Sequence, residues 1–276
     1  MKIKQKTAYG KLLKRYKRFL ADVELEADGT QITAHCPDPG SMLTVAQPGR
    51  RVLLAQYSDS GRKLPYGLEL IRGGRCWIGV HPGRANAIVS EALIEQRIPE
   101  LAGYAEHRGE AYFESEAAAD LEAGPRTRFD FLLSAGARRA KDCFLEVKSV
   151  TMMRRGEYAF PDSVTLRGQR HLRALIAAKR AGYRAVLLFL VQRSDGRCLR
   201  LAEDIDPEYA RLAAEALRAG VEFLVYGTRI RVGQETLSIS LREGRIDFVR
   251  PRAKTAKTAK AKPFGQGAGR GSQSGG

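Results

Sequence analysis

The sequence contains no apolar stretch that is long enough to cross a membrane. Its longest uninterrupted apolar run, residues 185–191, has seven residues, whereas a membrane-spanning helix needs about 20. The charged start, Met1-Lys2-Ile3-Lys4, is not followed by the apolar segment of a secretory signal. We therefore expect a protein without a membrane span that stays in the cytoplasm.

Cysteine and histidine are both scarce and scattered. The sequence has no Cys-x-x-Cys pair and no His-Glu-x-x-His motif, which excludes the common zinc sites. This spacing predicts reduced thiols, most of them buried, and does not favour a catalytic role for any of the histidines. The four cysteines are Cys36, Cys76, Cys143 and Cys198.

Negative charge is also in short supply. Against 31 Asp and Glu the chain has 47 Lys and Arg, so its formal net charge is +16, and polyanions are the expected partners. Residues 251–276 combine six of these cations with no acidic residue and predict a disordered basic tail. We expect Lys254 and Lys257 in this tail to contact nucleic acid; a solubility extension is the alternative.

Residues 1–82 have the pattern of a small β-barrel. Short β-type stretches bounded by turn residues cover 19–26, 31–36, 51–57, 68–72 and 75–80. We interpret them as an OB-like barrel that binds nucleic acid with cations and aromatics, and expect Arg15, Lys17 and Arg18 to contact DNA. The alternative is that the aromatic residues Tyr57, Tyr66 and Trp77 belong to the core.

Residues 83–250 alternate between helical and strand patterns, which is typical of an α/β or α+β domain. The predicted helices cover residues 85–96, 165–181 and 207–219. The predicted strands cover residues 111–115, 128–134, 143–150, 184–192, 221–231 and 235–241.

Two of these strands carry the residues with chemistry. Asp130 lies among apolar neighbours, where a carboxylate is costly unless something such as a metal ion binds it. Within 144–150 the two-residue period of a strand places Glu146 and Lys148 on one face. If the two strands pair as a hairpin, two carboxylates and an amine converge.

Such a set suits phosphodiester hydrolysis. The carboxylates of Asp130 and Glu146 offer hard oxygen donors for Mg²⁺, and Lys148 would orient and deprotonate a water molecule. A purely structural ion pair between Glu146 and Lys148 is the alternative.

The helix that follows begins with an unusual concentration of positive charge. Arg167, Arg170, His171 and Arg173 lie near its N-terminus, where cations oppose the helix dipole. A phosphate bound at that end would offset this conflict, so we expect Arg167 and Arg170 to contact DNA. Solvated surface arginines are the alternative.

Six ordered blocks of the sequence form a recognisable set. They include Arg15-Tyr16-Lys17-Arg18-Phe19, Cys36-Pro37-Asp38-Pro39-Gly40-Ser41, Arg128-Phe129-Asp130, Glu146-Val147-Lys148-Ser149, Phe160-Pro161-Asp162-Ser163 and Arg167-Gly168-Gln169-Arg170-His171. Together these blocks resemble the SfsA family, the sugar fermentation stimulation proteins, and the resemblance covers about residues 3–245.

The resemblance implies an N-terminal OB-like barrel followed by a domain similar to PD-(D/E)xK nucleases. It also implies sequence-independent DNA binding and a link to maltose metabolism. By position, Asp130 and Glu146 match the metal carboxylates and Lys148 the catalytic lysine. Gln169 on the following helix completes this catalytic set, and Glu91 on the preceding helix fits an accessory place. The chain departs from the family pattern at residues 38–40 and 80–86.

We therefore expect a cytoplasmic DNA-binding protein with domains at residues 1–82 and 83–250 and a tail at 251–276. Its second domain would bind Mg²⁺ or Mn²⁺ and have the geometry of an endonuclease or exonuclease. The alternatives are a non-catalytic DNA-binding transcriptional regulator and an RNA-binding module.

Overall fold

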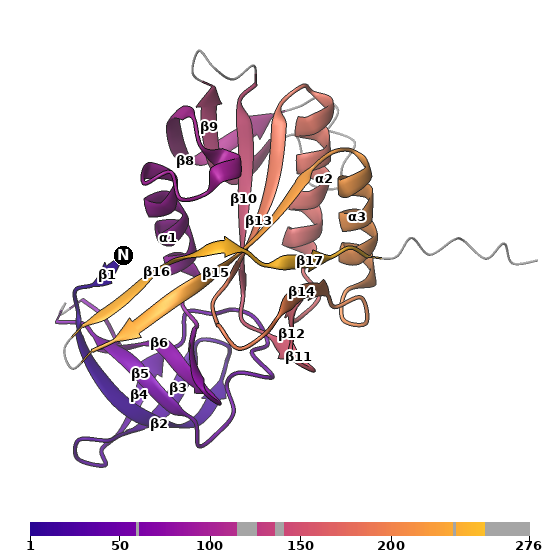
Figure 1. The fold of residues 1–276 in the computed structure, drawn as a ribbon. Coiled ribbons are helices and arrows are strands. Elements are labelled where there is room, and N and C mark those ends of the chain that lie inside the picture. Colours follow the sequence, from indigo (N-terminus) through magenta and orange to yellow (C-terminus); the bar gives the residue numbers. More distant parts are fainter. Residues whose placement is uncertain (59–60, 115–125, 136–140, 234–235, 252–276) are drawn as a thin grey trace, which may run out of the picture.

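The computed structural model describes residues 1–58, 61–114, 126–135, 141–233 and 236–251. These residues form a β-barrel followed by a mixed α/β domain (Figure 1). No helix of this described part is long and apolar enough to span a membrane. Of the free cysteines, Cys36 and Cys143 are buried, while Cys76 and Cys198 are only partly buried.

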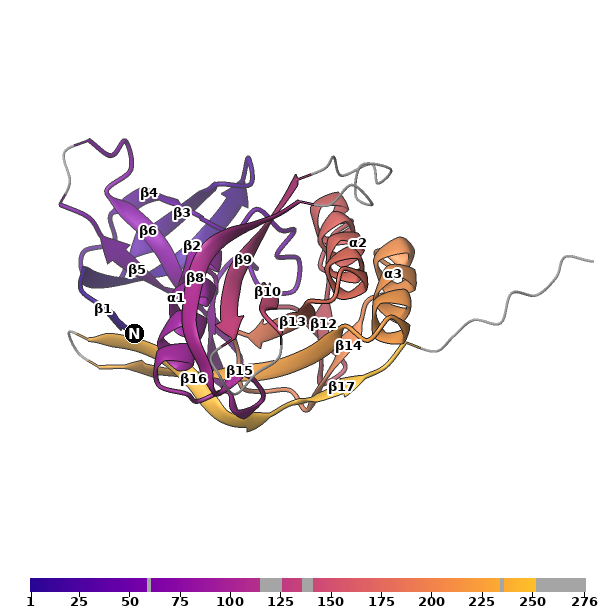
Figure 2. The same cartoon turned by 90° about the horizontal axis from the view of Figure 1, so that it is seen from above.

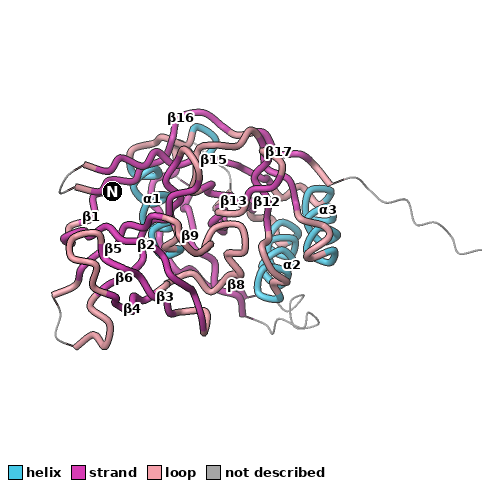
Figure 3. Tube along the Cα trace, turned by 90° about the horizontal axis from the view of Figure 1, so that it is seen from below, coloured by secondary structure: helices cyan, strands magenta, loops and turns pink. Residues whose placement is uncertain are grey.

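The barrel is an OB-like structure, as expected. Its sheet has the order β4-β3-β2-β5-β6-β7, and a parallel pairing of β4 with β6 closes it. The strands are β2 (Lys6–Tyr16), β3 (Leu20–Leu25), β4 (Gln31–His35), β5 (Arg51–Gln56), β6 (Tyr66–Gly73) and β7 (Cys76–Gly79). Figure 3 shows strands and loops but no helix in the described residues before α1.

Strand β2 is an addition to the strands predicted from the sequence. Its lysines conceal an alternating pattern, in which exposed Lys11 is followed by fully buried Leu12, because a strand points successive side chains to opposite faces. The aromatic residues Tyr57, Tyr66 and Trp77 are half-buried, so they are neither wholly core nor wholly surface.

The second domain is built on a seven-stranded sheet with the order β1-β16-β15-β13-β10-β9-β8. Its central strands β10, β13 and β15 are parallel, and residues 185–191 of β13 are completely buried, as both faces of such strands are covered. The strands are β1 (Lys2–Ile3), β8 (Tyr104–Glu114), β9 (Arg126–Ala135), β10 (Cys143–Val150), β13 (Arg184–Val191), β15 (Glu222–Val232) and β16 (Leu237–Arg245).

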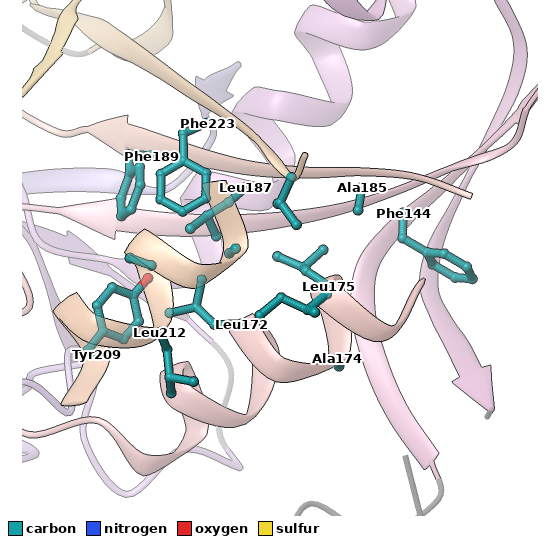
Figure 4. Packing of buried hydrophobic residues seen from close by; sticks show 14 of the residues in the cluster. Phe144, Leu172, Ala174, Leu175, Ala185, Leu187, Phe189, Tyr209, Leu212 and Phe223 are labelled. Carbon is teal, nitrogen blue, oxygen red and sulfur yellow. The ribbon is translucent and has the colours of Figure 1, made fainter. Parts of the chain in front are cut away.

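Helices cover both faces of this sheet (Figure 2). Helices α2 (Leu166–Arg180) and α3 (Pro207–Arg218) lie side by side on one face, and α1 (Pro82–Ile94) lies on the other. Figure 4 shows Leu172 and Leu175 of α2 packed with Leu212 of α3 and with Leu187 and Phe189 of β13. A short 3-10 helix (Pro99–Leu101) follows α1.

A small second sheet lies beside the C-terminal end of the domain. Its order is β11-β12-β14-β17, with β11 (Met153–Arg154), β12 (Glu157–Phe160), β14 (Cys198–Leu201) and β17 (Asp247–Val249). The sequence analysis did not predict these strands, because two to four residues are too few to show a period.

Candidate active site

Strands β9 and β10 bring the expected acidic residues together. They pair antiparallel, and the last ladder pair joins Leu145 to Phe131. Asp130 and Glu146 are the next residue on each strand, beyond the end of the ladder. Here the Val147 amide donates a hydrogen bond of 2.7 Å to Asp130 Oδ2. The Asp130 carboxylate thus accepts a bond from the β10 backbone that a backbone carbonyl would accept within a regular ladder.

Asp130 is held in place from two sides. Besides Val147, the Asn86 Nδ2 group near the start of α1 donates to Asp130 Oδ1 at 2.8 Å. Burial raises the pKa of the Asp130 carboxyl, and the negative charge of Glu146 raises it further. The hydrogen bonds therefore fix a carboxylate whose charge is unfavourable in this position.

Glu146 is the most buried charged group at the site, with 3% of its side chain exposed. Its Oε1 accepts a hydrogen bond from Lys148 Nζ at 2.7 Å and also contacts His171 Nδ1. Burial opposes ionisation, but Lys148 and His171 outweigh it and lower the Glu146 pKa to about 2. The second oxygen, Oε2, is buried without a hydrogen-bond partner.

The buried imidazole of His171 is a part of the site that the sequence analysis missed. It lies on α2, where Arg167 Nε donates to its Nε2 at 3.5 Å, which leaves Nδ1 to carry the proton toward Glu146. Lys148 Nζ is 3.2 Å from the same Nδ1. A usable signal existed in the sequence, because His171 is four residues before buried Leu175, a spacing that places both side chains on one face of a helix.

These groups open into a cleft of about 710 Å³ between the barrel and the α/β domain, a volume typical of ligand sites. The barrel contributes Arg18 and the loop at residues 38–40, and α2 contributes Arg167. Asp162 joins the two sides, since its Oδ2 accepts from the Met42 amide at 3.0 Å and its carbonyl from Ser41 Oγ at 2.6 Å.

Comparison with known proteins places this geometry in a family. One family model, the SfsA N-terminal OB domain, matches residues 13–80, and another, the sugar fermentation stimulation protein RE domain, matches residues 83–234. The chain belongs to the SfsA family. The resemblance inferred from the sequence blocks is thereby confirmed.

Relatives within the SfsA family match over most of their length. The sugar fermentation stimulation protein homolog of Geobacter sp. strain M21 is 45% identical over 230 residues, which are 83% of this chain and 94% of that protein. The homolog of Syntrophotalea carbinolica is 46% identical over 231 residues, or 83% and 93%. The structure of Pyrococcus furiosus SfsA in complex with Ca²⁺ covers 90% of this chain and 98% of its own, with a TM-score of 0.74 and 24% identity. This match shows the shared fold.

The predicted basic residues of this SfsA protein have different environments. Arg18 and Arg167 line the cleft, exposed Lys17 adjoins Arg18 in the tight turn after β2, and Arg170 is exposed on α2. Arg15 instead donates to the carbonyls of Asp38, Gly40 and Ser41. Its guanidinium therefore holds the loop that lines the cleft, and a DNA contact by Arg15 stays a prediction.

Two residues that the SfsA resemblance assigned to the site are not brought into the cleft. Gln169 is buried, and its Nε2 donates to both carboxylate oxygens of Asp206. Glu91 forms an ion pair with the N-terminal amine of Met1. Neither residue lines the cleft that contains Asp130 and Glu146.

The remaining predictions concern the basic tail and the number of metal ligands. Lys254 and Lys257 lie outside the residues that the structure describes. Within the described ranges, no three or more His, Cys, Asp or Glu side chains cluster closely enough to hold a metal ion by themselves.

Proposed function

We propose that this SfsA protein binds DNA without sequence preference and hydrolyses phosphodiester bonds with the help of Mg²⁺ or Mn²⁺. The observation that carries the proposal is the convergence of Asp130, Glu146 and Lys148 in one cleft with arginines at its mouth. Phosphodiester hydrolysis needs such a set of anionic metal ligands and a cation beside the scissile phosphate.

The residues present fit a divalent cation. The buried Oε2 atom of Glu146 has no partner, and buried polar atoms normally have one. Carboxylate oxygens are the ligands that Mg²⁺ and Mn²⁺ prefer, so Asp130 and Glu146 would hold the ion. The Pyrococcus furiosus SfsA structure contains Ca²⁺, which supports a divalent cation in this fold. When bound, the ion would neutralise charge on the scissile phosphate.

The protein's own groups have separable roles in this proposal. Lys148 holds its ammonium group at the edge of the cleft, with 13% of its side chain exposed, where it can donate to a phosphate oxygen or orient a water molecule. His171 and Asn86 are positioning residues, since each fixes one carboxylate. Arg18 and Arg167 would contact phosphates on either side of the reacting bond.

The proposal extends to the cellular role. The relatives carry the name sugar fermentation stimulation, and we infer that the chain acts on DNA in the cytoplasm, with an effect on sugar metabolism such as that of maltose. Binding through phosphates alone accounts for low sequence specificity.

The test is incubation of plasmid and single-stranded DNA with the full chain, with and without Mn²⁺. We expect cleavage only with Mn²⁺ and a loss of about 100-fold or more in Lys148→Ala, the scale of a positioned proton-transfer group. Lys141→Ala is the matched control, because Lys141 is exposed just before the same strand. Melting curves show whether each variant folds. If the wild type shows no Mn²⁺-dependent cleavage, or if a folded Lys148→Ala variant cleaves DNA as well as the wild type does, the protein is not a nuclease of this type.

A second candidate function is that of a non-catalytic DNA-binding regulator. It is favoured by the small number of ligands, since no three His, Cys, Asp or Glu side chains of the described residues lie close enough together to hold a metal ion. This alternative predicts tight DNA binding in a chelator and unchanged binding by Glu146→Gln. The nuclease proposal predicts that Mn²⁺ binds to the wild type and not to Glu146→Gln, which calorimetry distinguishes.

A further inference from the structure

A second cavity, of about 350 Å³, lies between the turn of the β6–β7 hairpin and strands β15 and β16. None of its lining residues lines the active-site cleft. Five arginines and the only tryptophan of the chain contribute to its wall: Arg72, Arg75, Arg193, Arg229, Arg242 and Trp77. We refer to it as the arginine pocket.

The positive charge of the arginine pocket is mostly uncompensated. Arg193 forms a bidentate pair with Asp195, at 2.7 and 2.8 Å. The other four arginines form no ion pair with a carboxylate of the described residues. Guanidinium groups gathered around one small cavity repel one another, and of these five only Arg193 is buried, while Arg75 and Arg229 are exposed. A bound anion would remove this repulsion.

Several side chains of the pocket are held in position. Arg193 is 5% exposed and donates to the Thr151 carbonyl at 2.8 Å. Arg72 lies 5.4 Å from the centre of the Trp77 ring, within the range of a cation–π contact. Trp77 in turn lies 6.3 Å from the ring of Tyr9. Binding would therefore cost less ordering of side chains than at a flexible surface.

We propose that the arginine pocket binds the phosphate group of a nucleotide. The planar fork of a guanidinium donates two parallel hydrogen bonds to phosphate oxygens, and arginine is the preferred residue for this recognition. The volume is at the lower limit of ligand sites, so it suits one phosphate with its sugar. The phosphate belongs either to a polynucleotide strand or to a free nucleotide.

The arginine pocket is independent of the proposed metal but adjoins its cleft. Thr151 lines the cleft, and Arg193 of the pocket bonds directly to the Thr151 carbonyl. A strand that leaves the cleft past this segment would reach the arginines.

Trp77 makes the proposal directly testable, because it is the only tryptophan and lines the pocket. Tryptophan fluorescence of the full chain is followed during titration with inorganic phosphate, AMP and a short oligothymidylate with or without a 5′ phosphate. A chelator is present throughout, so the result does not depend on the metal site or on nuclease activity. We expect a saturable change with at least one nucleotide probe.

Two variants distinguish the pocket from general surface charge. Arg229→Gln should weaken binding about tenfold, the scale of a lost charge-assisted hydrogen bond. Arg231→Gln should not, since Arg231 is exposed two residues further along β15 and does not line the pocket. Melting curves of both variants test whether the fold is intact.

The probes separate the two sources of phosphate. Tighter binding of AMP than of either oligonucleotide supports a free nucleotide, whereas tighter binding of the oligonucleotides supports a strand. If the oligonucleotide with a 5′ phosphate binds more tightly than the one without it, the end of the strand lies in the pocket. The absence of a saturable change with every probe, or equal weakening in Arg229→Gln and Arg231→Gln, would overturn the proposal.

Discussion

Replacing Glu146 with glutamine should destabilise the protein strongly, although the two side chains have nearly the same shape. Glutamine has no charge to pair with Lys148 or with the His171 N–H group. The ammonium of Lys148, with 13% of its side chain exposed, would then remain poorly solvated beside a neutral amide. Leaving a buried charge without its partner costs about 3–5 kcal/mol in other proteins.

The pKa of Glu146 leads to a similar magnitude. A fall from the ordinary 4.5 to about 2 corresponds to about 3 kcal/mol, at about 1.4 kcal/mol per pKa unit. Because a loss of 1 kcal/mol lowers Tm by about 2–4 °C in a chain of this size, we expect the Glu146→Gln variant to melt roughly 6–12 °C below the wild type.

The difference between wild type and Glu146→Gln should depend on pH with a definite sign. The Glu146 carboxyl has a lower pKa in the folded than in the unfolded chain, so the folded state binds fewer protons between pH 4.5 and about 2. Its stabilisation is complete above the unfolded pKa and is lost as pH falls toward the folded pKa. The two proteins should differ fully near neutral pH, differ clearly less near pH 3 and converge below about pH 2.

Asp130→Asn is the matched comparison, with the opposite expected sign. Burial raises the Asp130 pKa, so its charge costs stability at neutral pH. Asparagine can still accept from the Val147 amide, and the Asn86 amide can turn to accept from the new side chain. We expect a gain on the order of 1 kcal/mol, as is common when an active-site group is neutralised.

The assay is urea denaturation with a chelator present, for the wild type and both variants, near neutral pH and near pH 3. The argument fails if Glu146→Gln is as stable as the wild type at neutral pH. It also fails if the loss persists unchanged in acid, or if Asp130→Asn destabilises the protein as much as Glu146→Gln does.

Three further predictions concern the frame around the cleft. Glu69→Gln should cost about 3–5 kcal/mol in urea denaturation, because Glu69 is completely buried and pairs with Arg84 at 2.6 Å; an unchanged midpoint would contradict this. Thr165→Ala should cost about 1 kcal/mol in thermal melting, since the Thr165 hydroxyl caps α2, and Thr165→Ser should restore it. Arg18→Ala combined with Arg167→Ala should reduce the slope of log Kd against log salt for duplex DNA by about 2; an unchanged slope would show that neither residue contacts phosphate.

Much of the fold could be predicted from local pattern. The limits of β10 agree with the predicted 143–150, and the apolar run of β13 marked a strand buried on both faces. The predicted helix at 165–181 matches α2 and its cap, Thr165. In contrast, β11, β14 and β17 are stabilised by pairing between segments far apart in the chain, which leaves no periodic signal in so few residues.

The candidate active site, like the fold, was predictable from the sequence only in part. The two-residue period of β10 placed Glu146 beside Lys148, and the hairpin pairing brought Asp130 to them. Asn86 and His171 come from helices on opposite faces of the sheet, and only packing decides how closely those helices approach the strands. The same packing directs Gln169 to Asp206 rather than to the cleft.

The sequence by itself determined the excess of positive charge, the apolar core and the family. The tertiary structure alone decided what each charge does. Arg15 and Arg18 are three residues apart. Arg15 donates hydrogen bonds to loop carbonyls, whereas Arg18, beyond the end of β2, lines the cleft. The function of a charged side chain depends on which neighbours it meets in space, and a local pattern of residues does not contain that information.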